Sequence, residues 1–134
     1  MATTRHENLS VTANDAVVLV RQAVREFALE ARLSLVDQTK LVTAASELAR
    51  NMVVYGGGGT VLIELLEVDG RAGVRVTFED HGPGIADIDQ AMRDGFTSGG
   101  GLGLGLGGSK RLVHEFALQS AVGKGTTVTI TRWK

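Results

Sequence analysis

A run of glycines near the C-terminus constrains this chain more than any other feature. Seven of the ten residues in 99–108 are glycine, and Leu102, Leu104 and Leu106 alternate between them. So little side chain lets backbone N–H groups approach a ligand closely. A helical pattern over 109–116 follows, and a helix N-terminus adds a positive dipole end. The pair is typical of a phosphate cradle. A structural glycine loop fits the same residues, whereas a linker would favour serine and polar residues over leucine.

Two familiar phosphate motifs do not match this run. A Walker A loop ends in Gly-Lys-Ser/Thr, but the chain reads Gly108-Ser109-Lys110, and no convincing strand precedes it. The string Gly103-x-Gly105-x-x-Gly108 satisfies the dinucleotide fingerprint, which must lie between a strand and a helix of a Rossmann unit. Only 26 residues follow Gly108, too few for the rest of such a unit. We therefore exclude both motifs.

Length and composition predict one domain spanning 1–134. The core must be aliphatic, because 43% of residues are hydrophobic but only 4% are aromatic. The formal net charge is −1 and the charges are interleaved, so neither a nucleic-acid surface nor a membrane-binding basic segment is expected. The chain has no cysteine, which excludes disulfides and thiolate metal sites. With no apolar signal segment at residues 1–7, we expect a cytoplasmic protein.

Hydrophobic periodicity predicts the elements in order. A short strand around Leu9 and Val11 should precede amphipathic helices over 13–33 and 34–55, the first capped by Thr12 or Asn14 and the second by Ser34. The remaining elements are two hairpins with two helices between them: strands 60–68 and 74–80, helices 88–93 and 109–116, strands 117–122 and 126–133. This order predicts an α+β fold, with an antiparallel or mixed sheet covered by helices on one face.

Three residues carry polar groups that suggest a chemical role: a pair on the second predicted helix and an aspartate at the end of a predicted strand. Glu47 and Asn51 are four residues apart, so they stack on one helical face, opposite the apolar positions of that helix. Asp80 has the same strand parity as Val76 and Phe78, and therefore leans toward the apolar side. A carboxylate there needs a donor. Each feature also has an ordinary explanation: a solvated helix face, or an acid opening a Gly-Pro-Gly turn.

Taken in order, these features resemble the N, G1 and G2 boxes of the GHKL superfamily of ATPases and kinases, the Bergerat fold. The matching segments are Glu47-x-x-x-Asn51, Asp80-x-Gly82-x-Gly84 and the glycine–leucine loop, followed by Gly123-Lys124-Gly125-Thr126. The resemblance covers nearly the whole chain and implies a two-layer sandwich with a mostly antiparallel, mixed sheet. Ser46 to Asn51, Asp94-Gly95-Phe96 and Lys110 to Phe116 are further similar to RsbT-like switch serine/threonine kinases, relatives of anti-sigma factor kinases.

The resemblance implies specific roles at the nucleotide. Asp80 would accept a hydrogen bond from the adenine amino group, and Thr126 would approach adenine through water. Gly82 and Gly84 would leave room for the base. Asn51 would offer its amide oxygen to Mg²⁺ bound by ATP, and Glu47 would act as general base toward a protein hydroxyl.

The glycine loop would hold the triphosphate. Backbone N–H groups of Gly101, Gly103 and Gly105 would bind the phosphates, and the loop would close as a lid over ATP. No Lys or Arg lies in 95–108, so Lys110 or Arg50 would supply a cation, with Thr97 or Ser98 as neutral donors.

The implied partner is a STAS-domain antagonist, phosphorylated in a bacterial stress or sigma-factor pathway, with a PP2C-type phosphatase as a second target. Two alternatives stay open. The chain would instead be an anti-sigma factor that sequesters a sigma subunit, or a nucleotide-gated binding module with little phosphotransfer. The three histidines, His6, His81 and His114, lie outside any dimerising helical hairpin, which disfavours a histidine autokinase.

Overall fold

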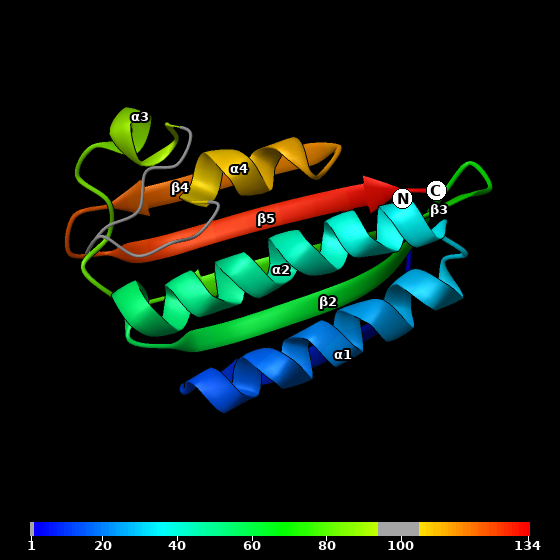
Figure 1. The fold of residues 1–134 in the computed structure, drawn as a ribbon, viewed down its shortest axis with the longest axis horizontal. Coiled ribbons are helices and arrows are strands. Elements are labelled where there is room, and N and C mark those ends of the chain that lie inside the picture. Colours follow the sequence, from blue (N-terminus) through cyan, green and yellow to red (C-terminus); the bar gives the residue numbers. More distant parts are fainter. Residues whose placement is uncertain (1, 94–104) are drawn as a thin grey trace.

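The computed structural model describes residues 2–93 and 105–134. Within these residues the elements follow one another as β1 (Ala2–Val11), α1 (Asn14–Glu30), α2 (Leu35–Gly56), β2 (Gly59–Val68), β3 (Arg71–Asp80), α3 (Ile88–Ala91), α4 (Gly105–Arg111), β4 (Glu115–Ala121) and β5 (Gly125–Trp133). Figure 1 shows β5 beside β4 and the two long helices running together across the sheet.

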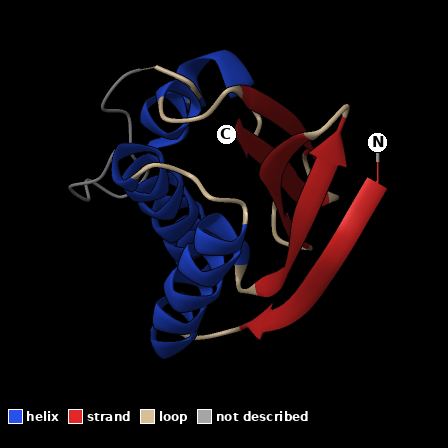
Figure 2. Ribbon diagram, turned by 90° about the vertical axis from the view of Figure 1, so that its right-hand side faces the viewer, coloured by secondary structure: helices blue, strands red, loops and turns tan. Residues whose placement is uncertain are grey.

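The sheet has the strand order β1-β2-β3-β5-β4, and every pairing between its described strands is antiparallel. The helices cover one face, which gives two layers (Figure 2). The predicted α+β sandwich is therefore confirmed, with the antiparallel alternative in place of the mixed one. Because β5 lies between β3 and β4, the C-terminal end of β3 lies next to the turn that joins β4 to β5.

The core lies between the helices and the sheet. It is mostly aliphatic, as composition required, and among the described residues its buried aromatic side chains are Phe27 and Phe78. The predicted apolar face of α2 is buried, since Leu41, Ala45, Leu48 and Met52 are each 3% exposed or less. The opposite face of α2 is thereby left to its polar side chains.

Local signals placed several boundaries correctly. Ser34 is the N-cap of α2, and its hydroxyl accepts a hydrogen bond from the Asp37 N–H at 3.1 Å. Asp69 and Gly70 join β2 to β3 with φ of 51° and 79°, as a type I′ turn requires. The helix α2 ends at Gly56, and Gly57 caps it with φ of 76°.

Three expectations about boundaries were wrong. The cap of α1 is Ala13, which makes no side-chain hydrogen bond, rather than Thr12 or Asn14. The first strand begins at Ala2, because its polar N-terminal half pairs with the free edge of β2. Finally, α4 ends at Arg111 and not at 116.

The early end of α4 has a tertiary cause. The His114 N–H donates to the Thr131 carbonyl at 3.0 Å, and Phe116 pairs with Ile130 in the β4–β5 ladder. The apolar residues that suggested a longer helix pack against the core from a turn and a strand instead.

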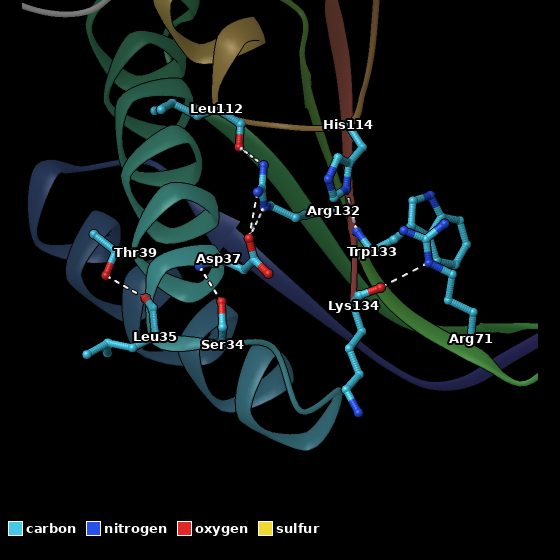
Figure 3. A network of polar contacts seen from close by, with 10 residues as sticks. All are labelled: Ser34, Leu35, Asp37, Thr39, Arg71, Leu112, His114, Arg132, Trp133 and Lys134. Atoms are coloured by element: carbon cyan, nitrogen blue, oxygen red, sulfur yellow. Dashed lines mark hydrogen bonds and ion pairs between the residues drawn. The ribbon is translucent and has the colours of Figure 1, made fainter.

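An ion pair fastens the start of α2 to the last strand (Figure 3). The Arg132 guanidinium donates twice to Asp37 Oδ1, at 2.6 and 3.1 Å, and once to the Leu112 carbonyl at 2.9 Å. Arg132 is only 9% exposed. Its hydrogen bonds lower the pKa of the Asp37 carboxyl below its usual range.

Candidate functional site

A cavity of about 450 Å³ opens between α2, the end of β3, the loop that follows it, and the starts of α4 and β5. Its apolar walls include Leu48, Met52, Phe78 and Val128, which are all buried. Polar side chains of Asn51, Asp80 and Thr126 also line it. A flat apolar ligand with a few polar edges suits such walls.

Asp80 ends β3 at this cavity, as its strand parity predicted. Its Oδ1 accepts a hydrogen bond from the Gly82 N–H at 2.9 Å. Within 2–93 and 105–134, Oδ2 has no hydrogen-bond partner. A half-buried carboxylate with one oxygen tied and the other unpaired is suited to accept a hydrogen bond from a ligand.

The glycines around Asp80 make room for close backbone approach. A Cβ on Gly56 would lie 2.5 Å from both Cγ and Oδ2 of Asp80, and a Cβ on Gly82 would lie 2.7 Å from the Gly56 backbone. Gly82 does not line the cavity, so it acts by packing against Gly56. Gly84 does line it, with φ of 77°, and packs against the Ala121 carbonyl.

Thr126 lies directly opposite Asp80 in the β3–β5 pairing. Its hydroxyl is 2.8 Å from that of Ser120 on β4. Ser120 also accepts from the Ile85 N–H at 2.8 Å and donates to the Gly125 carbonyl at 3.1 Å. One serine therefore ties the loop after Asp80 to the hairpin that carries Thr126. Sequence reasoning missed Ser120, although the turn at 123–125 is enough to place it opposite Thr126.

The predicted pair on α2 divides between two surfaces. Asn51 lines the main cavity. Glu47 is at its edge, where Oε1 accepts from the Gly105 N–H at 3.3 Å, and it also lines a second cavity between α1 and α2, with Arg21 and Arg25. Helical spacing thus placed both groups on one side of α2, and the packing of α4 against α2 decided what each one faces.

Arg50 connects this pair. Its Nη2 donates to Glu47 Oε1 at 2.9 Å and lies 3.5 Å from Asn51 Oδ1, while its Nε lies 3.4 Å from Glu47 Oε2. The Glu47 carboxylate raises the pKa of the Arg50 guanidinium, and Tyr55 adds to the effect. A third of the Arg50 side chain is exposed to solvent.

The glycine loop is described only from Gly105 onward, so Gly101, Gly103, Thr97 and Ser98 lie outside the described residues. Gly105 begins α4 and lines the cavity. Lys110 does not line it; its side chain is exposed in the last turn of α4. Neither Lys110 nor Arg50 lines the cavity, but Arg50 contacts Asn51, which does.

These residues fit a purine nucleotide with its metal. The apolar walls suit the base, and the unpaired Asp80 Oδ2 suits an exocyclic amine. Asn51 offers a neutral oxygen of the kind that Mg²⁺ takes when phosphates supply its other ligands. Among the described residues, no cluster of three or more His, Asp or Glu side chains could hold a metal by itself.

Comparisons with known proteins agree with this geometry. Residues 36–134 match the family described as histidine kinase-, DNA gyrase B-, and HSP90-like ATPase. The chain is 46% identical over 117 residues to serine/threonine-protein kinase RsbT of Bacillus subtilis, covering 87% of this chain and 88% of that one. It is 31% identical over 120 residues to an anti-sigma F factor of Geobacillus, covering 84% and 81%.

Solved structures show the same fold. The RsbU and RsbW domains of a Mycobacterium tuberculosis protein match with a TM-score of 0.63 at 23% identity, over 98% of this chain and 33% of that longer one. The mycobacterial sensor histidine kinase MprB matches with a TM-score of 0.53 at 22% identity, over 96% and 97%. The chain belongs to the histidine kinase-, DNA gyrase B- and HSP90-like ATPase family.

Proposed function

We propose that this protein is an ATP- and Mg²⁺-dependent serine/threonine kinase that phosphorylates a STAS-domain antagonist in a bacterial partner-switching pathway. The observation that carries the proposal is that three elements, α2, β3 and β5, bring Asn51, Asp80 and Thr126 to one cavity and Glu47 to its edge. The 46% identity to a serine/threonine-protein kinase over most of both chains supports the reaction class.

Each residue has a distinct task in this mechanism. Asp80 Oδ2 accepts a hydrogen bond from the adenine amine, which selects adenine over guanine. Asn51 would hold Mg²⁺ through its side-chain oxygen, and the metal would supply positive charge to the phosphates. The Gly105 N–H, which donates to Glu47 Oε1 at 3.3 Å, would donate to a phosphate oxygen when ATP is bound.

Glu47 is the general base. It takes the proton of the attacking protein hydroxyl as the bond from that oxygen to the terminal phosphorus forms and the bond from phosphorus to the leaving ADP oxygen breaks. Its position between the main cavity and the cavity beside α1 supports this role, because the nucleotide and the protein hydroxyl then approach from different sides.

One observation favours a second candidate. The 31% identity to an anti-sigma F factor, over 84% of this chain, is compatible with direct binding of a sigma subunit. A nucleotide-gated module that activates a PP2C-type phosphatase is the third candidate. The presence of Glu47 favours the kinase over a protein that only binds, because such a protein has no need of a base beside the phosphates.

The decisive experiment identifies the phosphorylated partner. The protein is co-purified with its partners from its own cells, incubated with ATP and Mg²⁺, and the partners are examined by mass spectrometry for phosphoserine and phosphothreonine. We expect one phosphosite on a STAS-domain protein, absent with the Glu47→Ala variant. Stable capture of a sigma subunit with no phosphosite would support the anti-sigma alternative instead.

A cytoplasmic location and the absence of nucleic-acid and membrane partners stay part of the proposal. In the described ranges, no helix has the length and apolar character to cross a membrane.

A further inference from the structure

The triphosphate of a bound nucleotide needs a cation that the glycine loop does not contain. Residues 95–108 include neither Lys nor Arg. In the described part of the chain, Lys110 is exposed and does not line the cavity, whereas the Arg50 guanidinium lies beside Asn51, which lines it. Arg50 does not itself line the cavity, but its contact with Asn51 places its guanidinium next to the residue that would hold the metal of the triphosphate.

The same guanidinium is paired with the Glu47 carboxylate. Nη2 and Nε of Arg50 contact both carboxylate oxygens, at 2.9 and 3.4 Å, and the Gly105 N–H donates to Oε1 at 3.3 Å. Glu47 is nearly covered, with 11% of its side chain exposed. These donors occupy both lone pairs of Oε1 and one of Oε2, so the one acceptor site left for a substrate hydroxyl is on Oε2, beside the positive charge of Arg50.

We propose that Arg50 is a catalytic residue that exchanges the Glu47 carboxylate for the terminal phosphate of ATP, and so releases the base only when a triphosphate is bound. The inference rests on the proposed kinase function. A terminal phosphate can accept two parallel hydrogen bonds from a guanidinium, so it can compete with the Glu47 carboxylate for Arg50. ADP lacks that group, so Arg50 stays on Glu47 in the ADP state.

A change of partner by Arg50, from Glu47 to the terminal phosphate, has two consequences that would not follow if Arg50 only held Glu47 in place. First, Arg50 contributes to binding of ATP but not of ADP, and therefore sets the preference between them. Second, the guanidinium changes partner on binding ATP, and the Arg50 Nε–H resonance should move with a non-hydrolysable ATP analogue and not with ADP.

The test compares Arg50→Gln and Arg50→Lys with the parent by calorimetry of ATP-analogue and ADP binding. We expect Arg50→Gln to lower the ratio of analogue affinity to ADP affinity by about tenfold or more, the usual worth of a charged hydrogen bond. Arg50→Lys keeps the positive charge but loses the two parallel N–H donors of the guanidinium, so its affinity ratio should lie between those of the parent and Arg50→Gln. Arg5→Gln is the matched control, because Arg5 pairs with Glu30 at 2.8 Å on a surface away from the cavity.

Thermal unfolding of each variant checks that it folds, and the Arg50 Nε–H shift is measured in the parent itself. An unchanged affinity ratio in Arg50→Gln, or an Nε–H resonance that responds equally to ADP and the analogue, overturns the inference. These readouts do not depend on phosphotransfer. If no partner is phosphorylated but Arg50→Gln lowers the ratio of analogue to ADP affinity, the proposed kinase function is wrong and the role of Arg50 at the phosphate is supported. If a partner is phosphorylated but that ratio is unchanged, the kinase function is supported and the role of Arg50 is wrong.

Discussion

Replacing Asp80 by asparagine has an outcome that the local geometry determines. Oδ1 accepts the Gly82 N–H at 2.9 Å, and an amide NH₂ cannot accept there. The asparagine must therefore keep its carbonyl oxygen on Gly82. Its NH₂ takes the place of Oδ2, the oxygen that is unpaired within the described residues. If adenine binds as proposed, a donor then faces the donor of the adenine amine.

The cost follows from the bond that is lost. A hydrogen bond to a charged group contributes about 1.5–3 kcal/mol, which corresponds to about 10- to 150-fold in Kd. Asparagine has nearly the volume of aspartate and keeps the Gly82 contact, so the free energy of unfolding should change little. The same replacement should narrow the preference for ATP over ITP, because the carbonyl at position 6 of hypoxanthine accepts the new donor.

Calorimetry with ATP and ITP measures both effects, and urea unfolding provides the control for stability. We expect weaker ATP binding and a smaller ATP-to-ITP ratio in the folded variant. Equal ATP affinity in folded Asp80→Asn would remove Asp80 from the nucleotide site and refute the argument from its unpaired oxygen.

Three other changes test separate parts of the structure. Glu47→Ala should retain ATP binding while phosphotransfer falls by about 10²–10⁴-fold, measured by single-turnover transfer to the partner; an unchanged rate refutes the base. Gly56→Ala places a Cβ 2.5 Å from Asp80 Oδ2, so calorimetry should show weakened ATP binding. Asp37→Asn should cost about 2–3 kcal/mol in urea unfolding, because it leaves Arg132 poorly paired while Asp37 is a quarter exposed. The lowered pKa of Asp37 means that this stabilisation is present above its unfolded value of about 3.9 and is lost as the pH falls through the folded value; a difference that persists at lower pH contradicts the pairing.

Much of the fold was predictable because its signals are local. The burial of the apolar stripe of α2 follows from helical periodicity, and the Ser34 cap and the Asp69-Gly70 turn each depend on residues within four positions of one another. The stacking of Glu47 and Asn51 and the inward lean of Asp80 follow from the same short-range geometry. The candidate site could be proposed in outline on these grounds.

The sequence by itself thus determined the elements, the faces they bury and the chemical types available at the site. Only the tertiary structure decided which of these groups meet. The insertion of β5 between β3 and β4 places Thr126 opposite Asp80, and the contact of α4 with α2 brings the Gly105 N–H to Glu47. The tertiary structure also decided that α4 ends at Arg111 and that Arg132 pairs with Asp37. The physical reason is that strand order and helix packing depend on burial and hydrogen bonding between segments far apart in the chain, which no short-range pattern encodes.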